Sequence, residues 1–468
     1  MCSSAGKLDP YSSLVRVPIV GGHILSGLTT KIHRIRHGRI PKNLALRDRL
    51  CPINFAHYLY DFPLSRDLDV AVQPDKPRDQ GEIEPDSVGH LTATLPAWVY
   101  YSQDFFEAEK QKIFLSSWQL VGHTSDLPEP GCYITFQLYE ERAVVVRTQD
   151  DEIKAFHNVC RHRAHILLND DRGTCPGKFV CPYHGWTYDL EGNRTAIGHP
   201  TSFLPHDAQH FALSPVDMEI YGGFIFIRFR SEGAGVAERM SPVHEEFMAY
   251  QTLLMTPEEK SETKPVMWTH AVDADWKVGV ENFIEDYHFF IGHRGLFGLM
   301  EEQYDREPLG PDVARLSHKM RARPQPSWSA EAYNKLLPDQ THLPKEMRRR
   351  WTYYALYPNN FFDCYPDQVN FFQILPVAPG KSLLRCQSYV LQDDSRAMRA
   401  TRYLNSRIND RVQDEDNNLI ESVQKGLVSS SYQSGVLSDK ENLVKHFADF
   451  IRDKIPSAAA TIQAKSLH

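Results

Sequence analysis

Two short loops, each holding one cysteine and one histidine, constrain this chain more than any other feature of its sequence. The first loop, CRHR, supplies Cys160 and His162, and the second, CPYHGW, supplies Cys181 and His184. Thiolate and imidazole are both good metal ligands, and two such loops can close on one metal centre. The pattern therefore predicts a metal site to which each loop contributes one sulfur and one nitrogen.

Two kinds of metal centre fit this ligand set. Zinc accepts a tetrahedral shell of two cysteines and two histidines. A [2Fe–2S] cluster accepts two cysteines on one iron and two histidines on the other, and the neutral imidazoles raise its reduction potential. Zinc fingers usually place both cysteines on one side and both histidines on the other. The mixed loops favour the iron–sulfur cluster and leave zinc as the alternative.

A second metal site is indicated further along the chain by His288 and His293. On an ideal helix, residues five apart are rotated by about 140°, so both rings reach one metal only if the helix ends between them. Gly292 is placed to allow that break. Two histidines and one carboxylate form the facial triad that binds non-haem Fe(II). The acid-rich segment 411–424 offers several carboxylates, whereas ordinary packing of His288 in a core is the simpler alternative.

The order of helix and strand patterns predicts a mixed fold. A proline- and glycine-rich linker at 72–96 precedes a helix at Asp104–Leu115, and short β-rich runs separated by turns fill 118–230. A helix is expected over Val272–His288, and a long helix over Asp394–Gly426 with the glycine as its C-cap. The other expected elements are strands at Trp351–Leu356, Val369–Leu375 and Leu383–Leu391, a polar loop with short helical pieces at 321–350, and a closing helix at Asp439–Ile455.

Composition narrows the class of protein. The 468 residues carry a net charge of −8, which argues against a general nucleic-acid binder. The longest apolar runs are strand-sized, so no membrane span is expected. Eight scattered cysteines favour a reducing compartment, and the cytoplasm is the expected location. The basic first fifty residues are interpreted as a surface extension, with an organelle transit peptide as the alternative.

The stretch CRHR…CPYHGWTYDLEGN resembles the Rieske motif of ring-hydroxylating oxygenases, and the resemblance extends over roughly residues 95–455. It implies an α+β fold, in which an antiparallel β Rieske [2Fe–2S] domain packs beside a helix-grip (START-like) catalytic domain with an antiparallel sheet. Three parts are expected: an extension and linker at 1–95, the Rieske domain at 96–230 and the catalytic mononuclear iron domain at 231–468. The implied cluster ligands are Cys160, His162, Cys181 and His184.

The same resemblance assigns roles around the second metal. The segments Glu281–His293 and Gln413–Gln424 resemble the two helical segments that hold the mononuclear Fe(II) in this family. Carried over residue by residue, they imply His288, His293 and Asp416 as iron ligands, with Asp414 as the alternative acid. Glu285 would be the catalytic bridge in a homotrimer, between a cluster histidine (His184) of one subunit and His288 of the next.

The family resemblance implies the oxygenase component of a two-centre redox enzyme. The chain shows no Gly-x-Gly-x-x-Gly pattern, so electrons must come from a separate NAD(P)H-dependent reductase, with or without a ferredoxin. The expected reaction is O₂-dependent hydroxylation of a small organic molecule. The alternatives are an aromatic-ring dioxygenase, a Rieske electron carrier, and a ligand-binding protein without catalytic iron.

Residue 285 bears on the substrate, because many ring dioxygenases have aspartate at the bridging position. Glutamate looks more like the monooxygenase branch that acts on quaternary ammonium compounds, and we favour that branch. Aromatic faces can enclose a trimethylammonium group, although they can equally hold a benzene ring or simply pack a core. The expected pocket aromatics are Phe289, Phe290, Phe297, Tyr353, Tyr354, Phe361, Phe362, Phe371 and Phe372.

Two features depart from the family pattern near the cluster. Ala164, followed by His165, stands where the family usually has glycine, and extra residues including Cys175 lie between the two loops. We interpret Cys175 as a buried or loop thiol and not as a ligand. Packing around the cluster is expected to differ at these positions, with all four ligands retained.

Overall fold

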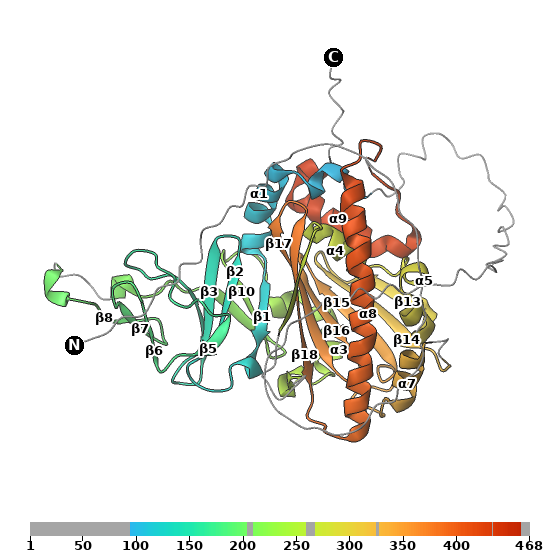
Figure 1. Ribbon diagram of the computed structural model, residues 1–468, viewed down its shortest axis with the longest axis horizontal. Coiled ribbons are helices and arrows are strands. Elements are labelled where there is room, and N and C mark those ends of the chain that lie inside the picture. The colour runs from blue at the N-terminus through green and yellow to red at the C-terminus, as the bar shows by residue number, and fades with distance from the viewer. Residues whose placement is uncertain (1–93, 204–208, 259–266, 324–326, 433, 460–468) are drawn as a thin grey trace, which may run out of the picture. The chain divides into compact units, whose positions relative to one another are not determined.

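The computed structural model describes residues 94–203, 209–258, 267–323, 327–432 and 434–459. The N-terminal extension and almost all of the linker predicted at 72–96 lie outside these ranges. Within them the strands form four antiparallel sheets (Figure 1), which confirms the α+β class with antiparallel sheets. No helix in the described ranges is both long and apolar enough to cross a membrane.

Three small sheets form the part of the chain that holds the Cys–His loops. Their strands are short and are separated by tight turns, as the run of turn signals predicted. The four-stranded sheet has the order β4-β3-β2-β5, and the two three-stranded sheets have the orders β6-β7-β8 and β1-β10-β9. The strands are β1 (Gln119–His123), β2 (Cys132–Leu138), β3 (Glu141–Arg147), β4 (Ile153–His157), β5 (Arg172–Thr174), β6 (Lys178–Val180), β7 (Thr187–Asp189), β8 (Arg194–Ala196), β9 (Asp217–Tyr221) and β10 (Phe224–Arg228).

One large sheet dominates the second half of the chain. Seven of its strands follow the order β11-β18-β17-β16-β15-β14-β13, and β12 also pairs with β18. The strands are β11 (Thr256–Pro257), β12 (Trp268–Val272), β13 (Met300–Pro308), β14 (Val313–Met320), β15 (Arg350–Leu356), β16 (Asn360–Cys364), β17 (Val369–Ala378) and β18 (Lys381–Val390).

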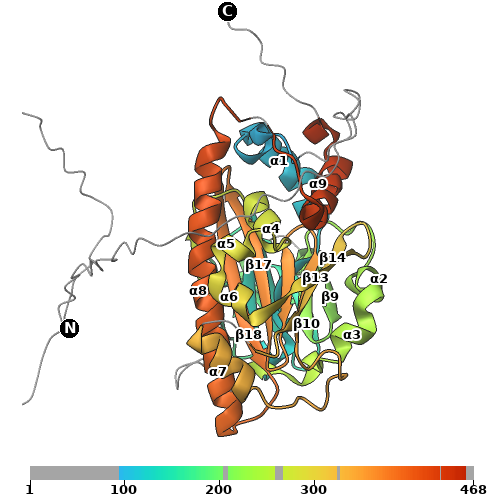
Figure 2. The same cartoon turned by 90° about the vertical axis from the view of Figure 1, so that its right-hand side faces the viewer.

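Helices cover one face of this large sheet (Figure 2). The long helix α8 lies along this face. Helix α8 is contacted by α4, α5, α6 and α7, and α4 also contacts β17 and β18. The helices are α1 (Gln103–Lys112), α2 (Val236–Arg239), α3 (His244–Met248), α4 (Trp276–Phe283), α5 (Phe289–Gly292), α6 (Arg294–Leu299), α7 (Trp328–Leu336), α8 (Arg396–Leu427) and α9 (Asn442–Lys454). This layered arrangement is the predicted helix-grip architecture.

Two of the expected helices differ from the observed ones. The helix expected over Val272–His288 is wrong at both ends, because Val272 ends β12 and α4 ends at Phe283. Asp275 sets the start of α4, since its side chain accepts a hydrogen bond from the Lys277 amide at 3.0 Å. The long helix α8 runs through Gly426, so that glycine is not its C-cap.

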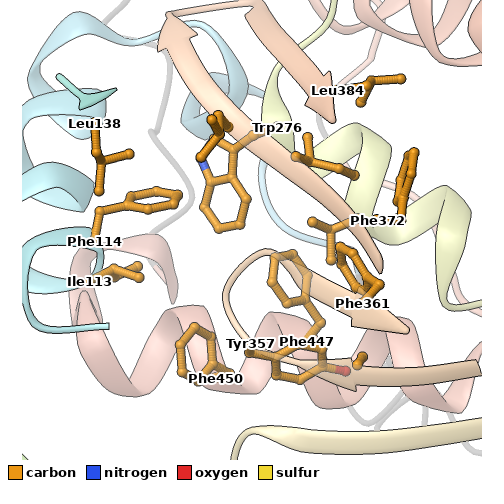
Figure 3. Packing of buried hydrophobic residues seen from close by; sticks show 14 of the residues in the cluster. Ile113, Phe114, Leu138, Trp276, Tyr357, Phe361, Phe372, Leu384, Phe447 and Phe450 are labelled. Carbon is orange, nitrogen blue, oxygen red and sulfur yellow. The ribbon is translucent and has the colours of Figure 1, made fainter. Parts of the chain in front are cut away.

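A continuous apolar core joins the Cys–His part of the chain to the large sheet (Figure 3). Trp276 of α4 is fully buried, and its ring packs edge-on against Phe114 at 4.8 Å and against Phe447 of α9 at 5.6 Å. The same cluster includes Leu138 of β2 and Phe372 of β17. Because segments distant in the sequence share this core, the described parts of both halves fold as one packed body.

A buried ion cluster lies inside this core beside Trp276. The Lys277 ammonium contacts Glu109 of α1 and Asp275, each at 2.6 Å, and the Lys277 side chain is fully buried. The Trp276 ring N–H donates to Glu109 at 3.2 Å. The cluster therefore joins α1 to the first turn of α4, which leads toward the candidate iron site.

Replacing Lys277 with methionine is expected to lower the free energy of unfolding by about 3–5 kcal/mol, because two buried carboxylates lose their cation. The midpoint of urea denaturation, followed by circular dichroism, measures the change. The control is Lys381→Met, since Lys381 pairs with Asp273 on the exposed surface. A loss of less than about 1 kcal/mol at both positions would contradict the interpretation.

Candidate functional site

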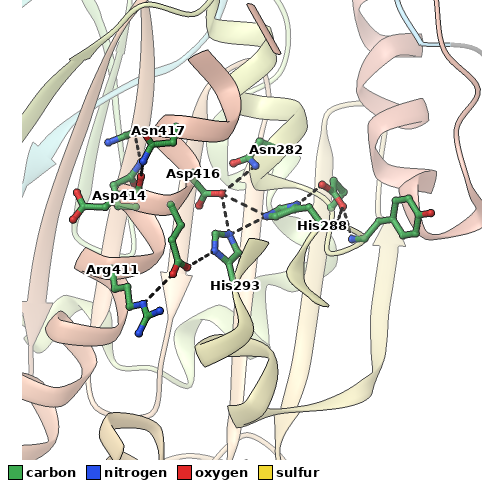
Figure 4. A network of polar contacts seen from close by, with 12 residues as sticks. Asn282, His288, His293, Arg411, Asp414, Asp416 and Asn417 are labelled. Atoms are coloured by element: carbon green, nitrogen blue, oxygen red, sulfur yellow. Dashed lines mark hydrogen bonds and ion pairs between the residues drawn. The ribbon is translucent and has the colours of Figure 1, made fainter. Parts of the chain in front are cut away.

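Three ligand atoms from two separate segments converge beside α8 (Figure 4). The Nε2 atoms of His288 and His293 lie 3.0 Å apart, and Oδ1 of Asp416 lies 3.5 Å from the former and 2.9 Å from the latter. Ligand atoms that bind one metal at right angles with bonds of roughly 2.1 Å lie about 3 Å apart. The geometry therefore fits a facial triad.

Local backbone structure explains how residues five apart reach one point. The expected helix has already ended at Phe283, and a separate single-turn helix, α5, lies between the two histidines, with His288 as its N-cap and His293 as its C-cap. The contribution of Gly292 is space, because a Cβ there would lie 3.3 Å from the His288 ring and 3.1 Å from Leu419 of α8. Gly292 thus lets the His288 ring approach α8 closely.

Carboxylates hold the far side of both imidazole rings. Nδ1 of His288 contacts Glu285, and Nδ1 of His293 lies 2.9 Å from Glu415, which in turn accepts a hydrogen bond from Arg411 at 2.9 Å. Such contacts fix the ring orientation and the tautomer, which leaves Nε2 free to bind a metal. Asp414, the alternative acid, points away from the two histidines (Figure 4).

The electrostatic field of this site favours a cation. Burial by itself would lower the pKa of His288, but hydrogen bonds to Asp416 and Glu285 outweigh it and raise that pKa to about 9. Burial would raise the pKa of Asp416, and the two histidines lower it instead. A site that binds protons this firmly presents the same negative potential to a divalent metal.

A cavity of about 480 Å³ opens beside the triad, with His288 and Asp416 in its wall. Of the nine rings expected there, Phe289, Tyr353 and Phe372 line it. Tyr354, Phe362 and Phe371 belong to a separate core on the other side of the sheet, because alternate residues of a strand face opposite ways. The other expected rings are not lining residues: Phe361 packs against Phe283, Phe297 lies under Arg321, and Phe290 is exposed.

The two Cys–His loops adopt the same backbone turn. The Ala164 amide donates to the Cys160 carbonyl at 3.1 Å, and the Gly185 amide donates to the Cys181 carbonyl at 3.0 Å. Both cysteines are buried, whereas His184 is exposed. The two loops approach each other, because the ring centroids of His162 and His184 are 4.7 Å apart.

The surroundings of these loops suit a two-iron cluster. The buried Nδ1 of His162 has no hydrogen-bond partner, and burial together with the charges of His184 and Arg163 lowers its pKa, which keeps the ring neutral. Among the described residues, sets of three ligand atoms within 4.8 Å of one another occur at His288, His293 and Asp416 but not at these loops. A neutral imidazole is the form that binds a metal, which suits the two histidine ligands of a Rieske cluster.

Comparison with known proteins identifies the family. Residues 117–205 match the Rieske [2Fe-2S] domain, and residues 260–457 match the ring hydroxylating alpha subunit (catalytic domain). The carnitine monooxygenase oxygenase subunit of Acinetobacter pittii is 30% identical over 357 residues, which cover 74% of this chain and 89% of the relative. The chain belongs to the Rieske oxygenase family.

Two further similarities agree with this assignment. The chloroplastic choline monooxygenase of Arabidopsis thaliana is 26% identical over 378 residues, which cover 78% of this Rieske oxygenase and 84% of the relative. The crystal structure of the quaternary ammonium Rieske monooxygenase CntA in complex with an inhibitor has a TM-score of 0.67 at 23% identity. That alignment covers 80% of this chain and 99% of CntA, and it shows the shared fold.

Membership in the family settles several sequence-based expectations. This Rieske oxygenase is an oxidoreductase that uses a Rieske [2Fe–2S] cluster and a mononuclear iron, and it is the oxygenase component of its system. The zinc module, the pure electron carrier and the non-catalytic binding protein are thereby set aside. When bound, the mononuclear iron would supply the chemistry of O₂ activation, and His288, His293 and Asp416 are the residues that would hold it.

Sequence reasoning did not assign Glu415 or Tyr188 to either site. Glu415 contacts His293, and the Tyr188 hydroxyl lies 3.3 Å from the Cys160 sulfur while accepting the Arg161 amide at 3.0 Å. A hydrogen bond to a cluster sulfur tunes the reduction potential. Glu415 could have been suggested by its place beside Asp416, and Tyr188 by its place in the WTYDLEGN run.

Ala164 occupies a left-handed backbone conformation with φ of +56°, and Gly185 occupies the equivalent position of the second loop with φ of +70°. The conformation explains why relatives are expected to have glycine there, because a Cβ is strained in this region.

We expect Ala164→Gly to stabilise the protein by about 1 kcal/mol. The urea denaturation midpoint of the holoenzyme measures it, and Ala164→Val should shift that midpoint downward. A lower midpoint for the glycine variant would contradict the strain.

Proposed function

We propose that this Rieske oxygenase hydroxylates a quaternary ammonium compound at an iron bound by His288, His293 and Asp416. The observation that carries the proposal is the cavity beside these residues, whose wall includes the rings of Trp268, Phe372 and other aromatics. Aromatic faces attract a trimethylammonium group through the negative potential of the ring. The names of the relatives, which act on carnitine and choline, support the same substrate class.

We further propose that Cys160 and Cys181 bind one iron of the cluster, and that His162 and His184 bind the other. The domain limits of the proposal are 96–230 for the Rieske part and 231–468 for the catalytic part. Electrons would reach the cluster from a separate NAD(P)H-dependent reductase, with or without a ferredoxin. The cytoplasmic location stays a prediction.

The assembly that fits this function is a homotrimer in which one subunit's cluster faces the next subunit's iron. Within one chain, no contact between His184 and Glu285 occurs among the described residues. His184 is exposed beside the exposed ring of Tyr183, and Phe290 and Ile291 are exposed near Glu285. These two apolar surfaces, one at each metal site, are the pair that we propose to meet between subunits, with Glu285 as the bridge.

Oxygen consumption by the purified holoenzyme tests the proposal. With a surrogate reductase and NADH, we expect choline, glycine betaine or carnitine to stimulate O₂ uptake, with formation of a hydroxylated product, whereas benzoate and naphthalene should not. The preparation should be brown and contain about three irons per chain. Uptake stimulated by an aromatic acid or hydrocarbon instead would assign the enzyme to the ring dioxygenases.

A further inference from the structure

The sheet presents an ordered row of side chains to the cavity beside the iron site. Strand register places Leu316, Tyr353, Asp363, Asn370 and Ser388 directly opposite one another across five neighbouring strands, β14 to β18. Directly opposed residues point to the same face of a sheet. All five line the cavity, so its floor carries one carboxylate, Asp363, at its centre.

An apolar row lies next to this polar one. Phe361, Phe372, Cys386 and Trp268 are opposed in the same way on β16, β17, β18 and β12. The ring of Phe283 from α4 packs on Phe361 at 4.4 Å and is stacked with Phe372 at 5.4 Å. A ligand in the cavity therefore meets aromatic surface beside the carboxylate of Asp363.

The Asp363 carboxylate is buried and incompletely paired. The residue is only 9% exposed, and its Oδ1 atom has no hydrogen-bond partner. Burial raises its pKa to about 7, although hydrogen bonds to Asn370 and Tyr365 oppose that rise. A buried carboxylate oxygen without a partner is costly, and a positively charged ligand would remove that cost.

The charged side chains in the cavity wall are mainly acidic. The wall contains five carboxylates and, among the described residues, no lysine or arginine. The carboxylate of Asp416 is one of the five, and its charge is compensated by the iron it is proposed to bind. A ligand that carries a carboxylate of its own would place it near Asp363, and no described lysine or arginine of the wall could pair with that carboxylate, which is unfavourable.

We propose that Asp363 is the counter-ion that selects a substrate with a net positive charge, such as choline, over zwitterionic betaines that carry a carboxylate. This inference rests on the proposed function, because it takes a quaternary ammonium substrate as given. It goes further because it separates quaternary ammonium compounds into two groups: those with a net positive charge, and those whose own carboxylate makes them zwitterions. Asp363 acts as a specificity-determining residue on the floor of the cavity, while the apolar row contacts the methyl groups of the substrate's ammonium group.

Binding to the oxidised holoenzyme, measured by isothermal titration calorimetry, tests the inference with three probes. Choline is the cation, glycine betaine is the zwitterion, and 3,3-dimethyl-1-butanol is the neutral isostere of choline. We expect the wild-type enzyme to bind choline at least about tenfold more tightly than glycine betaine. The Asp363→Asn variant should lose about 10- to 100-fold in choline affinity and bind the neutral isostere as the wild type does.

Asp410→Asn is the matched control, because Asp410 is exposed at the same cavity and the substitution removes the same charge. Solvent screening should limit its loss of choline affinity to less than about threefold. The visible spectrum and iron content of each variant verify that both metals are retained. The ratio of the wild-type affinities for choline and glycine betaine is measured without any variant. It therefore tests the inference even if Asp363→Asn does not fold.

Different outcomes reject different statements. Glycine betaine bound as tightly as choline, or equal losses in the Asp363→Asn and Asp410→Asn variants, would overturn the inference. In that case, oxygen uptake stimulated by a betaine would leave the proposed function intact. If no quaternary ammonium compound binds or stimulates oxygen uptake, the proposed function fails, and the inference that rests on it is rejected too.

Discussion

Replacing Asp416 with alanine is expected to lower substrate-dependent oxygen consumption by at least about a thousandfold, because the iron then loses its only proposed carboxylate ligand. The iron content should fall from about three to about two atoms per chain, since the cluster has separate ligands. The visible spectrum of the cluster should stay unchanged, because Asp416 lies on α8 and the Cys–His loops lie among the small sheets.

Metal analysis combined with an oxygen-electrode assay measures both effects. The control is Asp414→Ala on the same helix, and that variant is expected to retain its mononuclear iron. The Asp416 carboxylate contacts both histidines and also accepts a hydrogen bond from Asn282 at 3.1 Å. Loss of the third iron from the Asp414 variant, with retention in the Asp416 variant, would reverse the assignment of the ligand.

The two metal sites differed in how far the sequence could predict them. The Cys–His loops are local, so their spacing was enough to predict a metal site and to favour the cluster. The pair His288 and His293 is also local, but the structure places Asp416 beside them from a helix 123 residues later than His293. Only the resemblance to a family could select this acid among its neighbours, because spacing in the sequence carries no information about that contact.

The large sheet was harder to predict than the small ones. The strands β15, β16 and β17 are almost entirely buried on both faces, so they lack the alternation of polar and apolar residues that marks a half-exposed strand. The β16 strand was not predicted. Where two aromatic residues are adjacent along a strand, the strand register is needed to decide which of the two faces the cavity. Asp363 went unnoticed for the same reason, since its opposition to Tyr353 and Asn370 is a property of pairing.

Helix boundaries near the iron site show a second limit. The residues from Val272 to His288 have a helical pattern, yet backbone hydrogen bonding ends α4 at Phe283 and begins a separate turn after His288. The separate turn α5 ends at Gly292, and this break in the helix between His288 and His293 accompanies the approach of their Nε2 atoms to 3.0 Å. The sequence signal that remained was the five-residue spacing, which requires such a break.

Glu285→Gln is expected to slow electron transfer to the iron site by about 10- to 100-fold while both metals stay bound. Glutamine has almost the same shape, but it lacks the negative charge that the Glu285 carboxylate places on Nδ1 of His288. On the proposed bridge, the same carboxylate would also meet the cluster histidine of the neighbouring subunit. Loss of its charge therefore weakens the contact with both histidines at once, whereas the substitution leaves all seven proposed metal ligands in place.

A single-turnover experiment measures the rate directly. The cluster is reduced in the absence of oxygen, the enzyme is mixed with oxygen and substrate, and reoxidation of the cluster is followed by its visible absorbance. Glu415→Gln is the matched control, because Glu415 makes the equivalent contact with His293 at 2.9 Å and has no proposed place in the bridge. At equal iron content we expect a much smaller decrease for that variant. If reoxidation of the Glu285 variant kept the wild-type rate, electrons would have to reach the iron by a route that does not include this carboxylate.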